Sequence, residues 1–160
     1  MRYRCYCGSE IDLIASKRNK FSTRVPLYCT LACLTQHIES FVPHDLIPAG
    51  TKSILSQATN DIWDPITKLW YRSKYEVYVA RYLKSLSYKV EYETRSLHFG
   101  TATYTPDFYL PDRSLFIDVK GLWSGSSKKK FHAAVDAGYH IILVPWYMEP
   151  RFRSKFGGNL

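Results

Sequence analysis

The pattern of apolar and polar positions is most regular between residues 73 and 146, where it predicts an α/β core. Residues 73–86 carry an apolar stripe at i, i+3, i+4, i+7, i+8 and i+11, formed by Tyr75, Tyr78, Val79, Tyr82, Leu83 and Leu86. This spacing is typical of an amphipathic helix. Residues 88–94 alternate and predict a strand, whereas residues 95–102 form a less regular return.

Two further strands are predicted on either side of a turn. Residues 107–110 and 115–120 flank Pro111-Asp112-Arg113-Ser114, whose residue types favour a hairpin. A helix over residues 128–137 should end at Gly138, and the apolar run 139–144 predicts a buried strand parallel to residues 115–120. This order predicts an α/β sandwich with a mixed sheet, in a core that spans residues 73–150.

The predicted hairpin carries an unusual set of charges. Alternate side chains of a strand point to the same face, so Asp118 and Lys120 share one face and Val119 points to the other. A hairpin this short places Asp107 beside Asp118. Two carboxylates and a lysine on one face suit Mg²⁺ binding and attack on a phosphodiester. The alternative, an acid at a sheet edge and a surface lysine, is disfavoured because strands rarely carry either residue.

Glu76 has two competing interpretations. Ser73-Lys74-Tyr75-Glu76 fits a capping box, in which the glutamate folds back on the N-cap amide. Alternatively, Glu76 projects towards the strand carboxylates as a third acid. The two roles compete, because a carboxylate turned to the backbone is turned away from a metal.

Residues 1–45 contain all four cysteines, Cys5, Cys7, Cys29 and Cys33. Cys5-Tyr6-Cys7-Gly8 resembles a metal-binding knuckle, and Cys29 and Cys33 share one face if Cys29 opens a helix. This plan is similar to a treble-clef zinc finger, in which four thiolates close a structural zinc site. His37 is a reserve ligand, and buried thiols that bind nothing are the alternative.

Three other stretches lie outside the predicted core. The basic residues Lys17, Arg18 and Lys20 either contact phosphates or form a solvated hairpin tip. Residues 46–72 predict a docked connection with a short helix over residues 51–58, and Trp63, Leu69 and Trp70 are expected to pack against a neighbour. Residues 151–160 are expected to form a basic tail that frays.

Composition changes this picture in two ways. The chain has 160 residues, a net charge of +8 and 16% aromatic residues, which fits a nucleic-acid partner. No apolar run approaches the 18 residues of a membrane span, and the first residues lack the apolar core of a signal peptide. We therefore expect a cytoplasmic protein, in which cysteines bind metal more often than they form disulfides.

The order Glu76, Pro106-Asp107 and Asp118-Val119-Lys120 resembles the PD-(D/E)xK nuclease superfamily, whose fold is a restriction-endonuclease-like α/β sandwich. Tyr104-Thr105-Pro106-Asp107-Phe108 and Val119-Lys120-Gly121-Leu122-Trp123 narrow the resemblance to the phage endonuclease I family, which resolves Holliday junctions. Residues 1–45 have no counterpart in that family.

The resemblance implies roles for individual residues. Asp107, Asp118 and the carbonyl of Val119 would bind Mg²⁺ or Mn²⁺, and Glu76 would assist a second ion. Lys120 would orient or deprotonate the attacking water, or stabilise the charge of the transition state. The run Lys128, Lys129 and Lys130 would hold a neighbouring phosphate, although a solvated charge run at a helix start is the alternative.

The function that follows is a metal-dependent DNA endonuclease, selective for junctions or branched DNA. A duplex endonuclease of the homing, restriction or transposon type is one alternative, and a DNA-binding or assembly protein with a weakly active nuclease fold is another. A homodimer is expected because a double-strand cut needs two active sites. The family also implies a phage-encoded enzyme that acts in the host cytoplasm.

Overall fold

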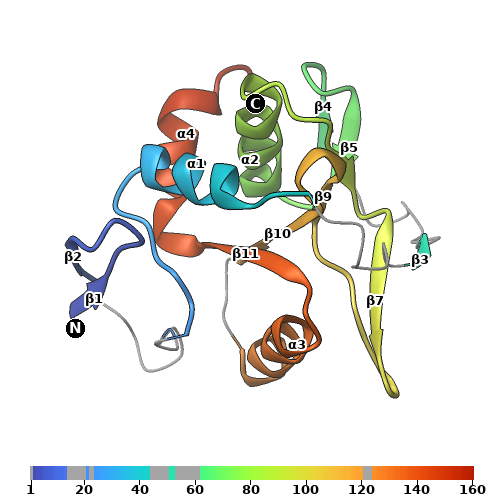
Figure 1. Ribbon diagram of the computed structural model, residues 1–160. Coiled ribbons are helices and arrows are strands. Elements are labelled where there is room, and N and C mark those ends of the chain that lie inside the picture. The colour runs from blue at the N-terminus through green and yellow to red at the C-terminus, as the bar shows by residue number, and fades with distance from the viewer. Residues whose placement is uncertain (1, 14–20, 22–23, 44–50, 53–61, 121–123) are drawn as a thin grey trace.

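A four-stranded mixed sheet lies at the centre of the molecule (Figure 1), in the strand order β11-β10-β9-β6. The computed structural model describes residues 2–13, 21, 24–43, 51–52, 62–120 and 124–160, and all structural statements concern these residues. Strands β10 and β11 are parallel, whereas β9 is antiparallel to both β10 and β6. The strands are β6 (Glu91–Tyr92), β9 (Phe108–Leu110), β10 (Leu115–Lys120) and β11 (His140–Pro145).

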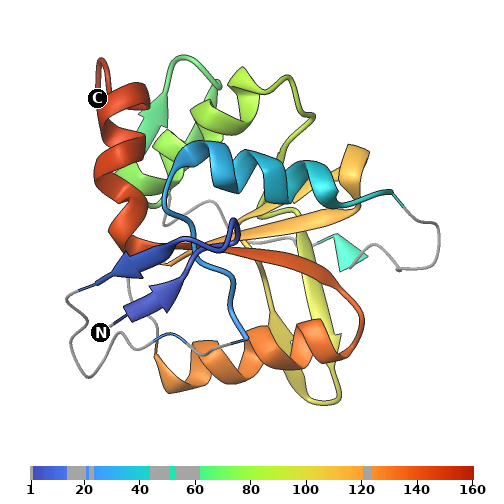
Figure 2. The same ribbon diagram turned by 60° about the vertical axis from the view of Figure 1, so that its left-hand side comes forward.

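Helices cover both faces of this sheet, as Figures 1 and 2 show. One face carries α1 (Leu31–Ser40), α2 (Lys74–Ser85) and α4 (Glu149–Phe156), and the other carries α3 (Gly125–Asp136). Residues 115–119 of β10 are buried, as expected for a central strand with a helical layer on each side. The predicted α/β sandwich with a mixed sheet and a parallel crossover is therefore confirmed.

Local capping explains where the two predicted core helices begin. Helix α2 starts after Ser73, whose Oγ accepts a hydrogen bond from the amide of Glu76 at 3.2 Å. Helix α3 starts three residues before the predicted Lys128, because Ser124 caps it by accepting from the amide of Ser127. It ends as predicted before Gly138, which adopts φ +93°.

The chain between α2 and β9 differs from the prediction. Only Glu91–Tyr92 of the predicted strand 88–94 is strand, because Glu93 adopts a left-handed φ of +48° that interrupts the alternation. Residues 95–102, predicted as a less regular return, belong to a hairpin of β7 (Arg95–Phe99) and β8 (Ala102–Tyr104). The predicted helix 51–58 is wrong at its start, since β3 (Thr51–Lys52) pairs with β7, and its other residues lie outside the described ranges.

The connection before α2 is a second hairpin, of β4 (Ile62–Asp64) and β5 (Leu69–Tyr71). Trp63, Leu69 and Trp70 were expected to pack against a neighbour, but they are 45%, 38% and 45% exposed. The prediction is wrong for Trp63 and Trp70 because the hairpin turns only alternate residues, such as Asp64 and Tyr71, towards the interior. Leu69 shares the face of Asp64 and Tyr71 but lies nearer the turn, where it is exposed.

The C-terminal residues do not fray as predicted. Residues 149–156 form α4, which packs along α2 and buries Phe152 completely. The Tyr82 ring of α2 meets the Phe152 ring edge-on at 5.2 Å between centroids. The basic residues of this segment face solvent on the other side of the helix, which is why composition alone indicated a tail.

The N-terminal strands, β1 (Arg2–Arg4) and β2 (Glu10–Asp12), form a separate antiparallel pair. The segment after them packs directly on the core, because the Tyr147 hydroxyl accepts from the Tyr28 amide at 2.8 Å and donates to the Tyr28 carbonyl at 2.9 Å. The described helices are all too short or too polar to cross a bilayer.

Candidate active site

Asp107 and Asp118 meet where two paired strands separate. The β9–β10 ladder ends at the pair Ile117 and Phe108, so the next pair in register would join Asp118 to Asp107. Pro106 has no amide hydrogen with which to continue the ladder. The Asp107 carboxylate accepts from the Val119 amide at 2.6 Å instead. The predicted proximity of the two acids thus follows from the hairpin register.

Both aspartates are buried, and their charges act on each other. Asp107 is 4% exposed and Asp118 is fully buried. Burial raises the pKa of Asp107 well above its usual range, and the negative charges of Asp118 and Glu76 raise it further. A group of buried carboxylates of this kind is costly unless cations neutralise it.

The two oxygens of Asp118 have different environments. Oδ2 lies 3.0 Å from the Nζ of Lys120 and accepts a short hydrogen bond from the Tyr104 hydroxyl. Oδ1 is buried and has no hydrogen-bond partner within the described residues. An oxygen of this kind is expected to bind a ligand, because buried carboxylate oxygens nearly always have a hydrogen-bond or metal partner. A divalent cation with a preference for oxygen ligands fits this position.

Glu76 combines parts of both predicted roles. Its carboxylate accepts from the Ser73 hydroxyl at 2.8 Å, from the Arg72 amide at 3.3 Å and from the Tyr92 hydroxyl. It therefore satisfies groups at the start of α2, but the amide from which it accepts is that of Arg72 and not, as the capping box predicted, that of the N-cap Ser73. It is also buried, and its charge acts on Asp107. Its role as a metal ligand stays a prediction.

Arg72 is a site residue that the sequence analysis missed. Its guanidinium forms an ion pair with Glu93 and lies 3.4 Å from the Asp107 carboxylate. The side chain is 46% exposed, so it reaches the acids from the solvent side. Its position directly before the N-cap of the helix that carries Glu76 was the only available signal.

Tyr104 and Tyr92 were also missed, because a tyrosine in a strand is ordinarily a packing residue. Burial raises the pKa of Tyr104 well above its usual range, and the charge of Asp118 adds to this effect. Its hydroxyl therefore stays protonated and donates to Asp118. Tyr92 holds Glu76 in the same manner. These two hydroxyls fix the orientation of two of the predicted acids.

The four cysteines form a cluster of candidate metal ligands in the described residues. The Sγ atoms of Cys5, Cys7, Cys29 and Cys33 all lie within 4.8 Å of one another, and the thiols are not joined by disulfides. Four such sulfurs are the ligand set of a structural zinc site. Among the described residues, the predicted acids do not form such a group of three or more candidate ligands.

Local structure explains why the cysteines converge. Gly8, with φ +90°, closes the turn after Cys7 by donating its amide to the Cys5 carbonyl. Thr30, not Cys29, caps α1, so Cys33 lies in the first turn of the helix and Cys29 lies before it. The Cys29 amide donates to the Cys5 sulfur at 3.1 Å. An amide aimed at a sulfur is typical of a knuckle that binds metal.

The thiols differ in their readiness to ionise. Hydrogen bonds to Ser9 lower the pKa of Cys7 to about 6, whereas the neighbouring Cys33 thiol raises the pKa of Cys29 to about 12. His37, the predicted reserve ligand, bonds to the Tyr28 hydroxyl at 2.7 Å and stacks on Tyr6. It does not belong to the sulfur cluster.

The predicted phosphate-binding lysines are only partly placed by the structure. Lys128, Lys129 and Lys130 lie in the first half of α3, and Lys129 and Lys130 are exposed. Lys17, Arg18 and Lys20 lie outside the described residues. Nucleic-acid contact by both groups stays a prediction.

Comparison with known proteins supports a nuclease. The chain is 39% identical over 93 residues to Endonuclease I of Escherichia phage T7, a match that covers 56% of each chain. It is 38% identical over 93 residues to Endodeoxyribonuclease 1 of Enterobacteria phage T3, over 56% of this chain and 55% of that protein. The chain thus spans just over half the length of these curated relatives. No family model and no solved structure matches it.

Proposed function

We propose that this chain is a metal-dependent DNA endonuclease of the PD-(D/E)xK type. The observation that carries the proposal is the buried Asp118 oxygen without a hydrogen-bond partner, beside Asp107 and Lys120 at the point where β9 and β10 separate. The similarity to two phage endodeoxyribonucleases supports the same chemistry and DNA as the substrate.

Each site residue has a role that its surroundings permit. Asp107, Asp118 and the Val119 carbonyl would hold Mg²⁺ or Mn²⁺, with Glu76 assisting. Such an ion neutralises charge on the phosphate and makes bound water more acidic. Lys120 is partly exposed and close to Asp118, so its ammonium can orient a water or stabilise charge on the phosphate. Tyr104 and Tyr92 hold Asp118 and Glu76 in place.

The cysteine cluster serves as a structural zinc site in this proposal. Four cysteines leave no open coordination position for chemistry. The cluster joins residues 5–7 to the start of α1, whose Thr35 hydroxyl meets the Tyr82 hydroxyl of α2 at 2.7 Å. Zinc would therefore fix the N-terminal residues against the helix that begins at the candidate active site.

Selectivity and assembly extend the proposal. We infer a preference for branched DNA and a homodimer with two active sites, since a double-strand cut needs two. Junction DNA competed against random duplex would separate this preference from that of a sequence-specific duplex endonuclease.

Asp118→Asn tests the proposal directly. We expect it to reduce Mg²⁺-dependent cutting of branched and supercoiled DNA at least about a hundredfold, because it removes a charge that holds the cation. Circular dichroism and DNA binding should stay close to those of the wild type. Asp136→Asn is a matched control, since Asp136 pairs with Arg24 at the surface, and it should cut normally.

Undiminished cutting by Asp118→Asn would refute the assignment. Calorimetric titration with Mn²⁺ addresses the other class of function. A chain that only binds DNA should show no metal-binding heat that depends on Asp107 and Asp118, whereas the proposed nuclease should lose this heat in Asp118→Asn.

A further inference from the structure

The β4–β5 hairpin presents an apolar surface formed by Trp63 and Trp70, which we call the Trp surface. Both side chains are 45% exposed. Trp63 and Trp70 are directly paired across the two strands, and their ring centroids are 5.5 Å apart at an angle of 52°. Large apolar groups gathered on one exposed hairpin mark an interaction site more often than scattered ones do.

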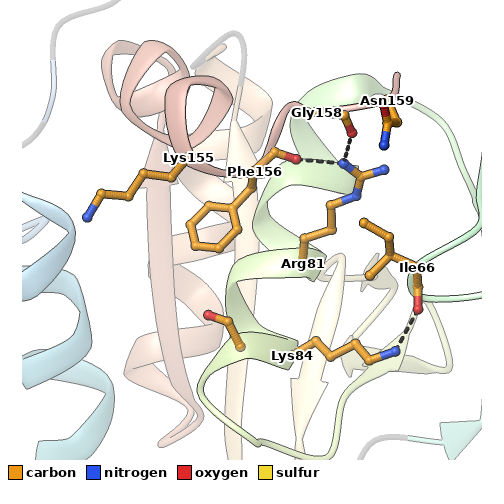
Figure 3. Close-up of a pocket in the computed structure, with 8 residues that line it drawn as sticks. Ile66, Arg81, Lys84, Lys155, Phe156, Gly158 and Asn159 are labelled. Atoms are coloured by element: carbon orange, nitrogen blue, oxygen red, sulfur yellow. Dashed lines mark hydrogen bonds between the residues drawn. The ribbon is translucent and has the colours of Figure 1, made fainter.

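The hairpin is held rigidly beneath this surface. The buried Asp64 carboxylate of β4 accepts from the Nη2 of Arg81 in α2 at 2.7 Å. The same guanidinium donates to the carbonyls of Phe156 and Gly158, and the Lys84 ammonium donates to the Ile66 carbonyl at 2.6 Å (Figure 3). The Trp surface is thus preorganised by α2 and the C-terminal residues.

The Trp surface is also connected directly to the candidate active site. Only Tyr71 separates Trp70 from Arg72, whose guanidinium lies 3.4 Å from the Asp107 carboxylate. The Tyr71 ring packs 4.6 Å from that of Tyr92, and the Tyr92 hydroxyl binds Glu76. A ligand on the Trp surface would therefore lie close to a phosphate at the acids.

The charges around the surface favour an anionic ligand with flat apolar faces. Between residues 62 and 74 the only acid is Asp64, which is buried and paired with Arg81. The cations Lys68 and Lys74 are exposed, and Arg72 is exposed as well, although its guanidinium also pairs with Glu93 and Asp107. Aromatic side chains beside cations are the means by which proteins bind single-stranded nucleic acid, because bases stack on the rings and phosphates meet the charges.

We propose that the Trp surface stacks on unpaired bases of the DNA next to the cleavage site. This inference rests on the proposed function and gives its preference for branched DNA a physical origin. In a continuous duplex the faces of the bases are covered by their neighbours, whereas a branch or an unpaired arm exposes them.

Trp70→Ala in the non-cutting Asp118→Asn background tests the inference. Binding is measured by fluorescence anisotropy to a forked DNA with unpaired thymine arms, to the same fork with abasic arms, and to a paired duplex. We expect Trp70→Ala to weaken binding to the thymine fork about fivefold to 150-fold, as loss of one base stack does. Binding to the abasic fork and the duplex should change less than twofold.

Controls separate stacking from loss of structure. Trp70→Phe should retain most of the affinity because phenylalanine still stacks, and Val42→Ala should have no effect, although Val42 is 71% exposed. If Trp70→Ala does not fold, quenching of wild-type tryptophan fluorescence by thymine arms, absent with abasic arms, tests the same contact.

Three outcomes would overturn the inference. The first is an equal loss of affinity for all three DNAs, and the second is unchanged affinity for the thymine fork. The third is a concentration-dependent monomer–dimer shift in sedimentation that only Trp70→Ala abolishes, since it would assign the surface to a second copy of the chain. In each case the single variant Trp70→Ala, which retains Asp118, should still cut plain duplex. The proposed nuclease function would then stand even though the inference about the Trp surface fails.

Discussion

Arg81→Met removes a side chain that joins the β4–β5 hairpin, α2 and the C-terminal residues. Arg81 is 5% exposed, and its Nε and Nη2 both donate to the Asp64 carboxylate, at 3.1 and 2.7 Å. Its Nη1 donates to the Phe156 and Gly158 carbonyls at 2.7 and 2.5 Å. Methionine fills similar volume but makes none of these bonds.

The expected cost follows from what stays behind. Asp64 is fully buried and would keep its hydrogen bonds from Ile66 and Thr67, but it would lose its counter-charge. Breaking a buried ion pair on one side costs about 3–5 kcal/mol. For a chain of this size that free energy lowers Tm by about 6–20 °C.

Urea denaturation followed by circular dichroism measures this cost. The double variant Asp64→Asn with Arg81→Met should recover most of the loss, because it removes the unpaired charge while the amide oxygen can still accept from the Thr67 amide and hydroxyl. Arg153→Met is the surface control, since its pair with Glu149 is 3.7 Å long and its side chain is 62% exposed. It should cost about 0.5 kcal/mol or less.

The reasoning is refuted if Arg81→Met unfolds within about 1 kcal/mol of the wild type, which is no more than one ordinary neutral hydrogen bond contributes. It is also refuted if the double variant is no more stable than the single one, since the cost would then not arise from the buried charge of Asp64.

Two further predictions concern the N-terminal residues. Adding a strong chelator to the zinc-loaded protein should lower Tm by about 8–16 °C, as expected for a ligand present at about a thousand times its Kd. Cys29→Ser should have the same Tm with and without chelator. An equal Tm of the wild type in both conditions would contradict the zinc site. Burial lowers the pKa of His37 from its usual 6.5 to about 4, so between these values the unfolded chain binds the extra proton and stability falls as pH falls. This loss of stability is at most about 3 kcal/mol before solvent screening. The His37→Phe variant should lose less stability than the wild type between pH 6.5 and 4. If the free energy of unfolding of the two proteins falls in parallel with pH, His37 does not contribute.

The order of elements in the core could be predicted because it depends on local patterns. The apolar stripe of α2, the turn residues before β10 and the apolar run of β11 each specify an element within one stretch of chain. The side-chain alternation of β10 and the length of its hairpin also bring Asp107, Asp118 and Lys120 together. These are contacts between residues close in sequence, for which register alone is sufficient.

Predictions failed where a contact between distant residues decides the structure. The basic C-terminal residues became α4 because Phe152 is buried against α2 and Arg81 binds the last carbonyls. The break at Glu93 depends on a left-handed backbone whose amide donates to the Asp107 carbonyl, a contact with no local signal.

The sequence by itself determined the α/β order, the acid and lysine pattern of the core and the pairwise spacing of the cysteines, since each follows from helix or strand periodicity. Tertiary structure alone decided that Arg72 and Tyr104 join the acids, that the four sulfurs converge, and that Trp63 and Trp70 face solvent. The physical reason is that burial and charge pairing depend on which surfaces meet in three dimensions, and periodicity does not specify those partners.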